Sequence, residues 1–175
     1  MPQIPGYDYG ASQVPRSPVT MEQLNRLKET VLLTDEDVRH LKKAGEVLSI
    51  QVEAILDVWY GFVGNHPFLL EYFLDKSGKP DSNYLQGVRG RFGQWIHDTC
   101  RAEYDQKWLD YQQEIARRHT PAKKNRTDGV DGKTSEVPLP YVIGFIYPIT
   151  ATIKPFLARG GATEDEVEKM PPSLV

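Results

Sequence analysis

The apolar residues of this 175-residue chain recur with helical spacing along almost its whole length. From Thr34 to about Gly64 they fall at every third or fourth position, which places them on one face of a helix. The clearest of them are Val52, Ile55, Leu56, Trp59, Tyr60 and Val63. No segment shows convincingly the alternation of apolar and polar residues, bounded by turn residues, that is typical of β-strands. The sequence therefore predicts an all-α fold.

Prolines and helix-capping residues divide the N-terminal part of the chain. Residues 1–18 contain four prolines, so we expect them to form an extended leader rather than a helix. Thr20, with Gln23 three residues later, has the spacing of a capping box and predicts a short helix. Thr34 precedes three acidic residues and predicts the start of the helix that runs to about Gly64.

Four further helices are predicted after Gly64. They span about 67–74, about 81–100, a segment that ends at His119, and about 138–159. A polar loop, about 120–137, separates the last two.

Glycines and prolines inside two of these helices have structural consequences. Gly87, Gly90 and Gly93 lie three residues apart in a predicted helix, where each costs about 1 kcal/mol relative to alanine. Either another helix or a flat ligand could approach the backbone closely there. Pro148 and Pro155 each remove a backbone hydrogen bond, so we expect them to bend the last long helix.

The composition argues against several classes of protein. The 21 basic and 24 acidic side chains nearly balance, so a nucleic-acid partner is not expected. Cys100 is the only cysteine, which excludes an internal disulfide and a zinc site built on several thiolates. No run of 18 apolar residues and no signal peptide is present, so we expect a cytoplasmic protein without a membrane partner. We interpret one basic run as a solvated helix end and loop: Arg117, Arg118, Lys123, Lys124 and Arg126.

His119 ends an aromatic stripe. Tyr104, Trp108, Tyr111 and Ile115 precede it on one helical face, and Thr120-Pro121 should stop the helix. A neutral imidazole that points into a core needs a hydrogen-bond partner or a metal ion. The residue types alone favour an ordinary core histidine.

Aromatic and aliphatic residues on the other predicted helices extend this pattern. They are Trp59, Tyr60, Phe92, Phe145 and Ile149. If their faces meet that of His119, they enclose an apolar cavity with one imidazole and one phenol, which suits an iron porphyrin. The alternative is an aromatic helical core in which the buried tyrosine donates to a backbone carbonyl.

Five segments resemble the protoglobins, which are single-domain haem proteins of the globin superfamily related to the domains of globin-coupled sensors. They are IPGYDYG (4–10), LDVWYGFVGNHP (56–67), RFGQWIHDT (91–99), WLDYQQEIARRH (108–119) and FIYPITATIKPFLAR (145–159). The resemblance implies a globin fold with an extra N-terminal helix, forming a haem domain over residues 19–175 behind the leader. The last helix should begin near Thr163, and we expect it to be truncated, since Pro171 and Pro172 follow soon after.

The resemblance also implies a site. His119 would be the iron ligand of haem b (iron protoporphyrin IX), and Trp59, Tyr60 and Phe92 would form the opposite wall. Phe145 and Ile149 would line the cavity, and we expect Val63 and Ile115 to contact the cofactor as well. Arg91 could pair with a haem propionate, although an ordinary solvated arginine is the commoner outcome. Dioxygen, carbon monoxide and nitric oxide are the implied ligands, and a homodimer is the implied assembly.

Three functions are compatible with the sequence. The first, which we favour, is a haem-based gas binder acting as sensor, scavenger or store. The second is a haem enzyme that acts on nitric oxide or peroxide, or transfers carbenes. The chain lacks a peroxidase-type histidine–arginine pair and an attached reductase domain. The third is a helical interaction module without haem.

Overall fold

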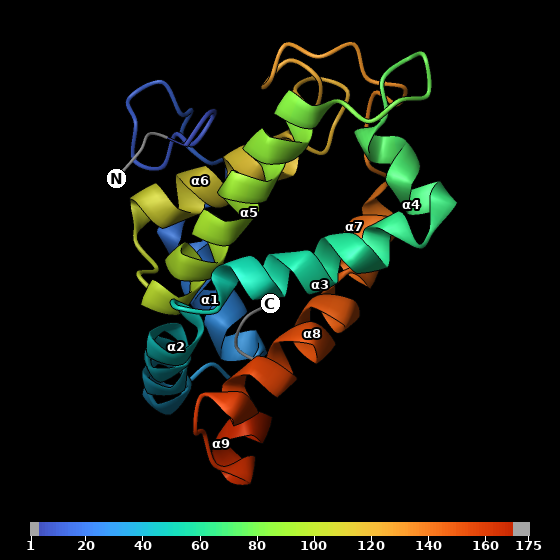
Figure 1. Ribbon diagram of the computed structural model, residues 1–175. Helices are drawn as coiled ribbons and strands as arrows, with labels where there is room; N and C mark the ends of the chain where they lie inside the picture. The colour runs from blue at the N-terminus through green and yellow to red at the C-terminus, as the bar shows by residue number, and fades with distance from the viewer. Residues whose placement is uncertain (1–3, 170–175) are drawn as a thin grey trace.

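The computed structural model describes residues 4–169, apart from the side chains of residues 165, 166 and 169, and the chain there is helical (Figure 1). Its helices are α1 (Met21–Thr30), α2 (Asp35–Leu48), α3 (Val52–Gly64), α4 (Pro67–Leu70), the short 3-10 helix η1 (Glu71–Phe73), α5 (Ser82–Arg101), α6 (Gln106–Arg117), α7 (Leu139–Gly144), α8 (Ile146–Arg159) and α9 (Glu164–Lys169). These residues form no strand, only two isolated β-bridges. The predicted all-α fold is confirmed.

Both predicted N-caps at the start of the chain are present. The Thr20 hydroxyl accepts from the Gln23 backbone N–H at 3.2 Å, and the Gln23 side chain accepts from the Thr20 backbone N–H at 2.8 Å. Thr34 and Asp37 form the same reciprocal pair at the start of α2. Each pair satisfies two N–H groups that the helix leaves without partners.

The prediction of one helix from Thr34 to about Gly64 is wrong. Two helices, α2 and α3, meet there at 91°. Gln51, at the corner, has a φ of −115° and a ψ of 1°, and its side-chain amide donates to the Val47 and Phe156 carbonyls at 2.9 and 3.1 Å. The corner lets both apolar faces pack on α5 and α8, which a straight helix could not do.

The last long helix is interrupted near Pro148. Phe145 lies in a turn between α7 and α8, one residue after Gly144. Pro148 has no N–H with which to bond the Gly144 carbonyl, which accounts for the interruption at this point. Pro155 lies inside α8. Ile146, at the start of α8, is 41% exposed.

The helix that leads to His119 begins later and ends earlier than predicted. The helix α6 begins after Asp105, whose side chain accepts from the Trp108 N–H at 2.8 Å, so Tyr104 precedes the helix. His119 itself lies in the turn after α6. Of the predicted stripe, Tyr111 is buried, and the other side chains are partly exposed.

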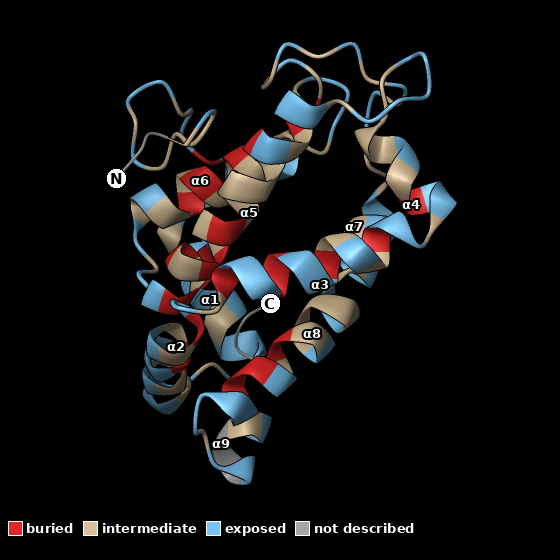
Figure 2. Ribbon diagram, viewed as in Figure 1, coloured by how far each residue is buried: buried red, intermediate tan, exposed pale blue. Residues whose placement is uncertain are grey.

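The core lies where α2, α3, α5 and α8 converge (Figure 2). Its most completely buried aliphatic residues are Leu41, Leu48, Leu56, Ile96, Ile153 and Leu157. α2 and α5 approach closely because Gly45 has no side chain: a Cβ there would stand 2.7 Å from the Cβ of Cys100. This contact fixes the crossing point of the two helices.

The three helical glycines of α5 make room for side chains of three different segments. A Cβ at Gly93 would stand 3.1 Å from Val52 of α3, and one at Gly90 would stand 3.3 Å from Ile4 of the leader. At Gly87 the neighbour is Asp128, at 3.2 Å. Close packing against the protein itself therefore accounts for these glycines.

The leader is free of helix over residues 4–18 and is bound to the domain by polar contacts. The Tyr7 hydroxyl donates to Asp98 at 2.8 Å. Arg118, in the turn after α6, donates to the Gly6 carbonyl at 2.6 Å and pairs with Asp8 at 2.9 Å. These bonds hold the leader against α5 and α6.

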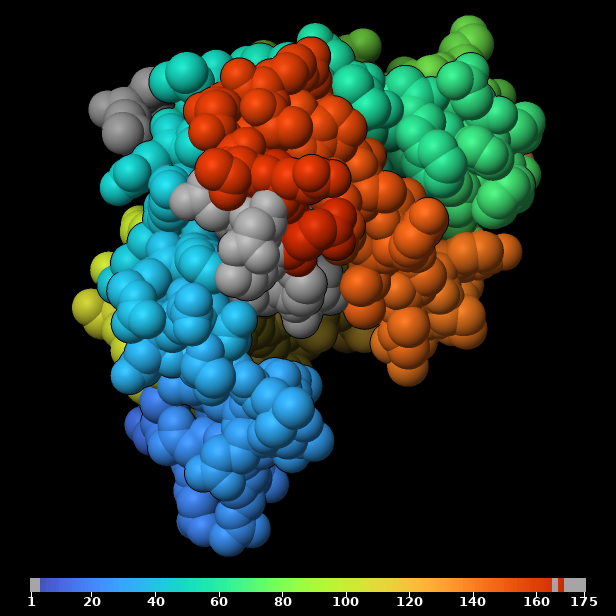
Figure 3. All heavy atoms as spheres, turned by 90° about the horizontal axis from the view of Figure 1, so that it is seen from below, coloured from blue at the N-terminus to red at the C-terminus, as the bar shows by residue number. Residues whose placement is uncertain are grey.

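An apolar face remains exposed along α7 and the start of α8, and the orange segment of Figure 3 shows part of it at the surface. Its large exposed residues are Leu139, Tyr141, Ile143, Ile146 and Tyr147. Among the described residues, Leu139–Arg159 meets the length and composition of a membrane-spanning helix, with a mean hydropathy of 1.3, and α2 with α3 meets them as a bent pair. Core helices of soluble proteins meet the same criteria, so the finding assigns no membrane.

Candidate functional site

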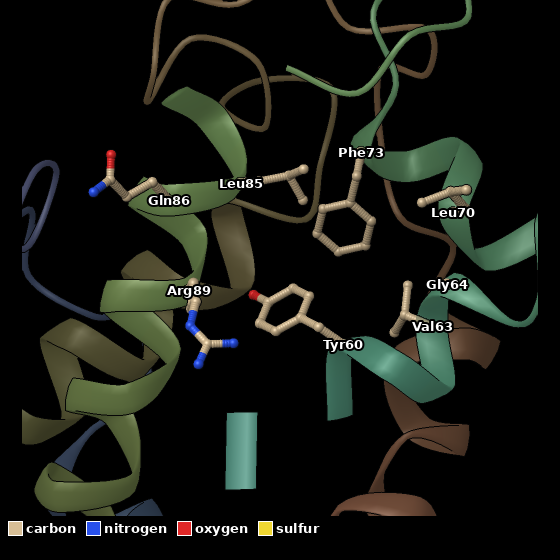
Figure 4. Close-up of a pocket in the computed structure, with 8 residues that line it drawn as sticks. All are labelled: Tyr60, Val63, Gly64, Leu70, Phe73, Leu85, Gln86 and Arg89. Atoms are coloured by element: carbon tan, nitrogen blue, oxygen red, sulfur yellow. The ribbon is translucent and has the colours of Figure 1, made fainter. Parts of the chain in front are cut away.

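A cavity of about 350 Å³ lies between α3, α4, η1 and α5 (Figure 4). Its lining residues are Tyr60, Val63, Gly64, Leu70, Phe73, Leu85, Gln86 and Arg89. The lining is mostly apolar, and the volume falls in the range of small-molecule and cofactor sites. Tyr60 and Val63 are the two predicted site residues that line this cavity.

Tyr60 supplies a phenol to the cavity. Its ring lies 6.0 Å from that of Phe73, and its hydroxyl points toward α5 (Figure 4). Burial raises the pKa of Tyr60, so the hydroxyl stays protonated at neutral pH. No group in the described part of the chain hydrogen-bonds to that hydroxyl. The Tyr60 hydroxyl is therefore available to donate a hydrogen bond to a ligand.

Arg89 closes one side of the cavity. Its guanidinium lies 5.8 Å from the centre of the Tyr60 ring and pairs with Glu53 and Asp57, each at 2.8 Å. Both carboxylates belong to α3, so the ion pairs join α5 to α3 beside Tyr60.

Trp59 is the centre of a second group of predicted residues. Its ring centre lies 5.7 Å from that of Phe92 and 5.2 Å from that of Phe145, both in edge-to-face arrangement. Trp59, Phe92 and Ile149 line a remaining space of only about 10 Å³. The structure thus brings these four predicted residues together, in a nearly filled aromatic cluster.

His119 is held by a backbone hydrogen bond. Its Nδ1 lies 2.9 Å from the Ile115 carbonyl oxygen, which can only accept, so Nδ1 carries the proton and Nε2 keeps its lone pair. Burial lowers the pKa of His119, and the Ile115 bond opposes this only in part. The ring is therefore neutral at pH 7. His119 and Ile115 are not among the residues that line the cavity, and their contact with a cofactor stays a prediction.

Arg91 is paired within the protein. Its guanidinium is largely buried and donates to both carboxylate oxygens of Asp128, at 2.8 and 2.7 Å, and to the Pro5 carbonyl at 2.8 Å. The interpretation as a solvated arginine is wrong, and its donors join the leader to the loop after α6. Its contact with a haem propionate stays a prediction.

Lys124 was not predicted as a site residue. It was interpreted as part of a solvated loop, but only 3% of it is exposed. Its Nζ donates to the Asn125 side chain at 3.1 Å and the Thr134 carbonyl at 3.3 Å, and lies 5.4 Å from the centre of the Tyr84 ring. Burial lowers the pKa of Lys124, and its charge helps to lower the pKa of His119. A lysine in a polar loop carries no sequence signal of burial.

His66 has a hydrogen bond like that of His119. Its Nδ1 lies 2.7 Å from the Phe62 carbonyl oxygen. The ring packs between Phe62 and Phe68, with centres 4.5 and 5.8 Å away. Within the part of the chain that the structure describes, no three histidine, cysteine or carboxylate side chains are grouped to hold a metal ion.

The sequence model of the Protoglobin family matches residues 20–174. This chain belongs to the protoglobin family. None of the curated proteins compared with the chain matched it. The family consists of globin-type haem proteins with an all-helical fold, in agreement with the helices described above.

The residues of this protoglobin fit a haem. A single imidazole with a free Nε2 supplies the one protein ligand that haem iron needs. The mostly apolar cavity suits a porphyrin face, and the buried Lys124 offers a positive charge for an anionic edge. Globin folds require no further metal ligand from the protein.

Proposed function

We propose that this protoglobin binds haem b with His119 as the iron ligand and reversibly binds a diatomic gas, as a sensor, scavenger or store. The hydrogen bond from His119 Nδ1 to the Ile115 carbonyl carries the proposal. Such a bond fixes the tautomer and the direction of a ligating imidazole and raises its basicity. A buried neutral ring is the form that coordinates iron.

When bound, haem supplies a coordination position for dioxygen, carbon monoxide or nitric oxide. The cluster of Trp59, Phe92 and Phe145 would exclude water from a gas bound to the haem and limit the space for it. Tyr60, as a protonated phenol in the cavity, donates a hydrogen bond to a ligand that carries negative charge. Selectivity among gases follows from this donor, because only polarised ligands gain from it.

We also propose a cytoplasmic homodimer. The large exposed apolar residues of α7 and α8 support the dimer, since apolar side chains gathered at a surface often mark an interaction site. A two-fold dimer would bury the same patch of both copies.

The His119 assignment is tested by haem retention. His119→Ala should abolish stoichiometric haem binding, because no other described side chain has its place. His66→Ala is the matched control, since His66 donates through Nδ1 to a carbonyl in the same way. The Soret band and the haem-to-protein ratio of the purified variants give the measurement. Loss of haem in the control variant only, or a five-coordinate ferrous spectrum in His119→Ala, would contradict the assignment.

A further inference from the structure

The ammonium group of Lys124 is a buried charge without a counterion. Among the described residues, the other strongly buried charged side chains, Asp98 and Glu114, pair with Arg101 and with Arg118. Lys124 has only neutral oxygen acceptors and the face of Tyr84, and no described carboxylate lies within ion-pair distance. A buried cation is expected to be paired, so an anion from outside the chain would complete this site.

A second polar group at the same place also lacks a partner. The Oγ1 of Thr134 is buried and makes no hydrogen bond within the described part of the chain. The carbonyl of the same residue accepts from Lys124, so the hydroxyl and the ammonium group belong to one small region. A hydroxyl and an ammonium together are two donors, which is what one carboxylate needs.

Lys124 is related both to His119 and to the wall of the cavity. Its charge acts on His119, which lies five residues earlier. Its Nζ lies over Tyr84, and the Tyr84 ring lies 6.2 Å from that of Phe73, which lines the cavity. Leu85, the neighbour of Tyr84, lines the cavity as well. Lys124 is therefore close to the cavity wall, and its charge reaches His119, the proposed iron ligand.

We propose that Lys124 and Thr134 bind a propionate carboxylate of the haem, so that the loop after α6 recognises the anionic edge of the cofactor. This inference rests on the proposed haem function and adds the residues that recognise the porphyrin edge. In the holoprotein the pair places the loop against the cofactor and slows its dissociation.

The decisive experiment compares two cofactors in the full-length protein. The apoprotein is reconstituted with haem b and with its dimethyl ester, in which both propionates are uncharged, and dissociation is followed by transfer to excess apomyoglobin. Lys124→Met should release haem b about 10- to 100-fold faster, the effect of losing one charge-assisted hydrogen bond. It should release the dimethyl ester at the wild-type rate.

Lys133→Met is the matched control, since Lys133 lies in the same loop but is exposed and pairs with Glu71. It should leave both rates unchanged. Equal acceleration of both cofactors in Lys124→Met would show a structural role only, and no acceleration of haem b would also overturn the proposal.

Two further measurements distinguish a failure of this inference from a folding defect of the variant. The Lys124→Met apoprotein should be at least as stable to urea as the wild type, because the variant removes an unpaired buried charge. If that variant fails to fold, Thr134→Val gives the second test, with faster loss of haem b but not of the ester expected. A wild-type protein that binds no haem overturns the proposed function, whereas one that retains haem and ester equally overturns this inference alone.

Discussion

Trp59 and Tyr60 are neighbours in the chain, but their side chains lie in different environments. Successive helical residues differ by about 100°, so one helix can present them to different surroundings. Trp59 fills the aromatic cluster with Phe92 and Phe145, and Tyr60 lines the open cavity. The steric and hydrogen-bonding roles proposed for this wall thus belong to separate residues, which substitutions can separate.

Tyr60→Phe should speed dioxygen dissociation from the reconstituted protein. A hydrogen bond to a charged partner contributes about 1.5–3 kcal/mol, so we expect a change of roughly 10- to 150-fold. Carbon monoxide gains much less from such a donor, and its release should change little. Stopped-flow and flash-photolysis rates give the measurement. Tyr84→Phe is the control, because Tyr84 is buried on α5 but does not line the cavity. Equal changes for both gases would show that Tyr60 lines the cavity without donating a hydrogen bond to the ligand.

At the scale of elements, α2 and α5 cross closely in the core. Gly45 and Cys100 meet there without space for another atom, and burial raises the pKa of the Cys100 thiol to about 12. Cys100 is thus a packing residue rather than a reactive thiol. The crossing holds α5 in the position from which its other end supplies Leu85, Gln86 and Arg89 to the cavity.

Gly45→Ala should destabilise the protein by about 1–3 kcal/mol, because the added methyl group overlaps Cys100. Gly61→Ala is the matched control in α3, where nothing lies within 4 Å of the new methyl group. It should stabilise by about 0.5–1 kcal/mol through helix propensity. Urea unfolding of the two variants measures both signs. Equal effects of the two substitutions would mean that the crossing is not tight.

For the molecule as a whole, the exposed apolar face of α7 and α8 is the feature that bears on assembly. Ile143 is 56% and Tyr147 is 79% exposed, although both lie in an apolar segment. A helix that is apolar around most of its circumference normally packs against another element. The face therefore supports the proposed assembly of two copies.

Replacement of Ile143 by Glu should dissociate the proposed dimer. A buried carboxylate without a partner at a two-fold interface is costly, and it occurs twice in the dimer, so we expect the dimer dissociation constant to rise at least about 100-fold. Sedimentation velocity over a concentration series gives the measurement. Ile50→Glu is the control, as Ile50 is 90% exposed at the corner between α2 and α3. A wild-type protein that is monomeric at every concentration would show the dimer proposal to be wrong.

Local signals in the sequence predicted most of the helices and several of their ends. The capping pairs at Thr20 and Thr34 were predicted correctly because a cap involves residues three positions apart. The corner at Gln51 was not predicted, since its side chain bonds to Phe156, more than a hundred residues later. Apolar periodicity continues through the corner and does not show which partner each face will meet.

The features of the candidate site were likewise predictable from the sequence only in part. The sequence by itself determined the family, the helical class and the set of aromatic residues with one histidine, because composition and spacing are properties of single segments. Only the tertiary structure decided that Arg91 pairs with Asp128, that Lys124 is buried and that Tyr60 rather than Trp59 lines the cavity. Burial and ion pairing depend on which distant segments come together, and no local pattern encodes that contact.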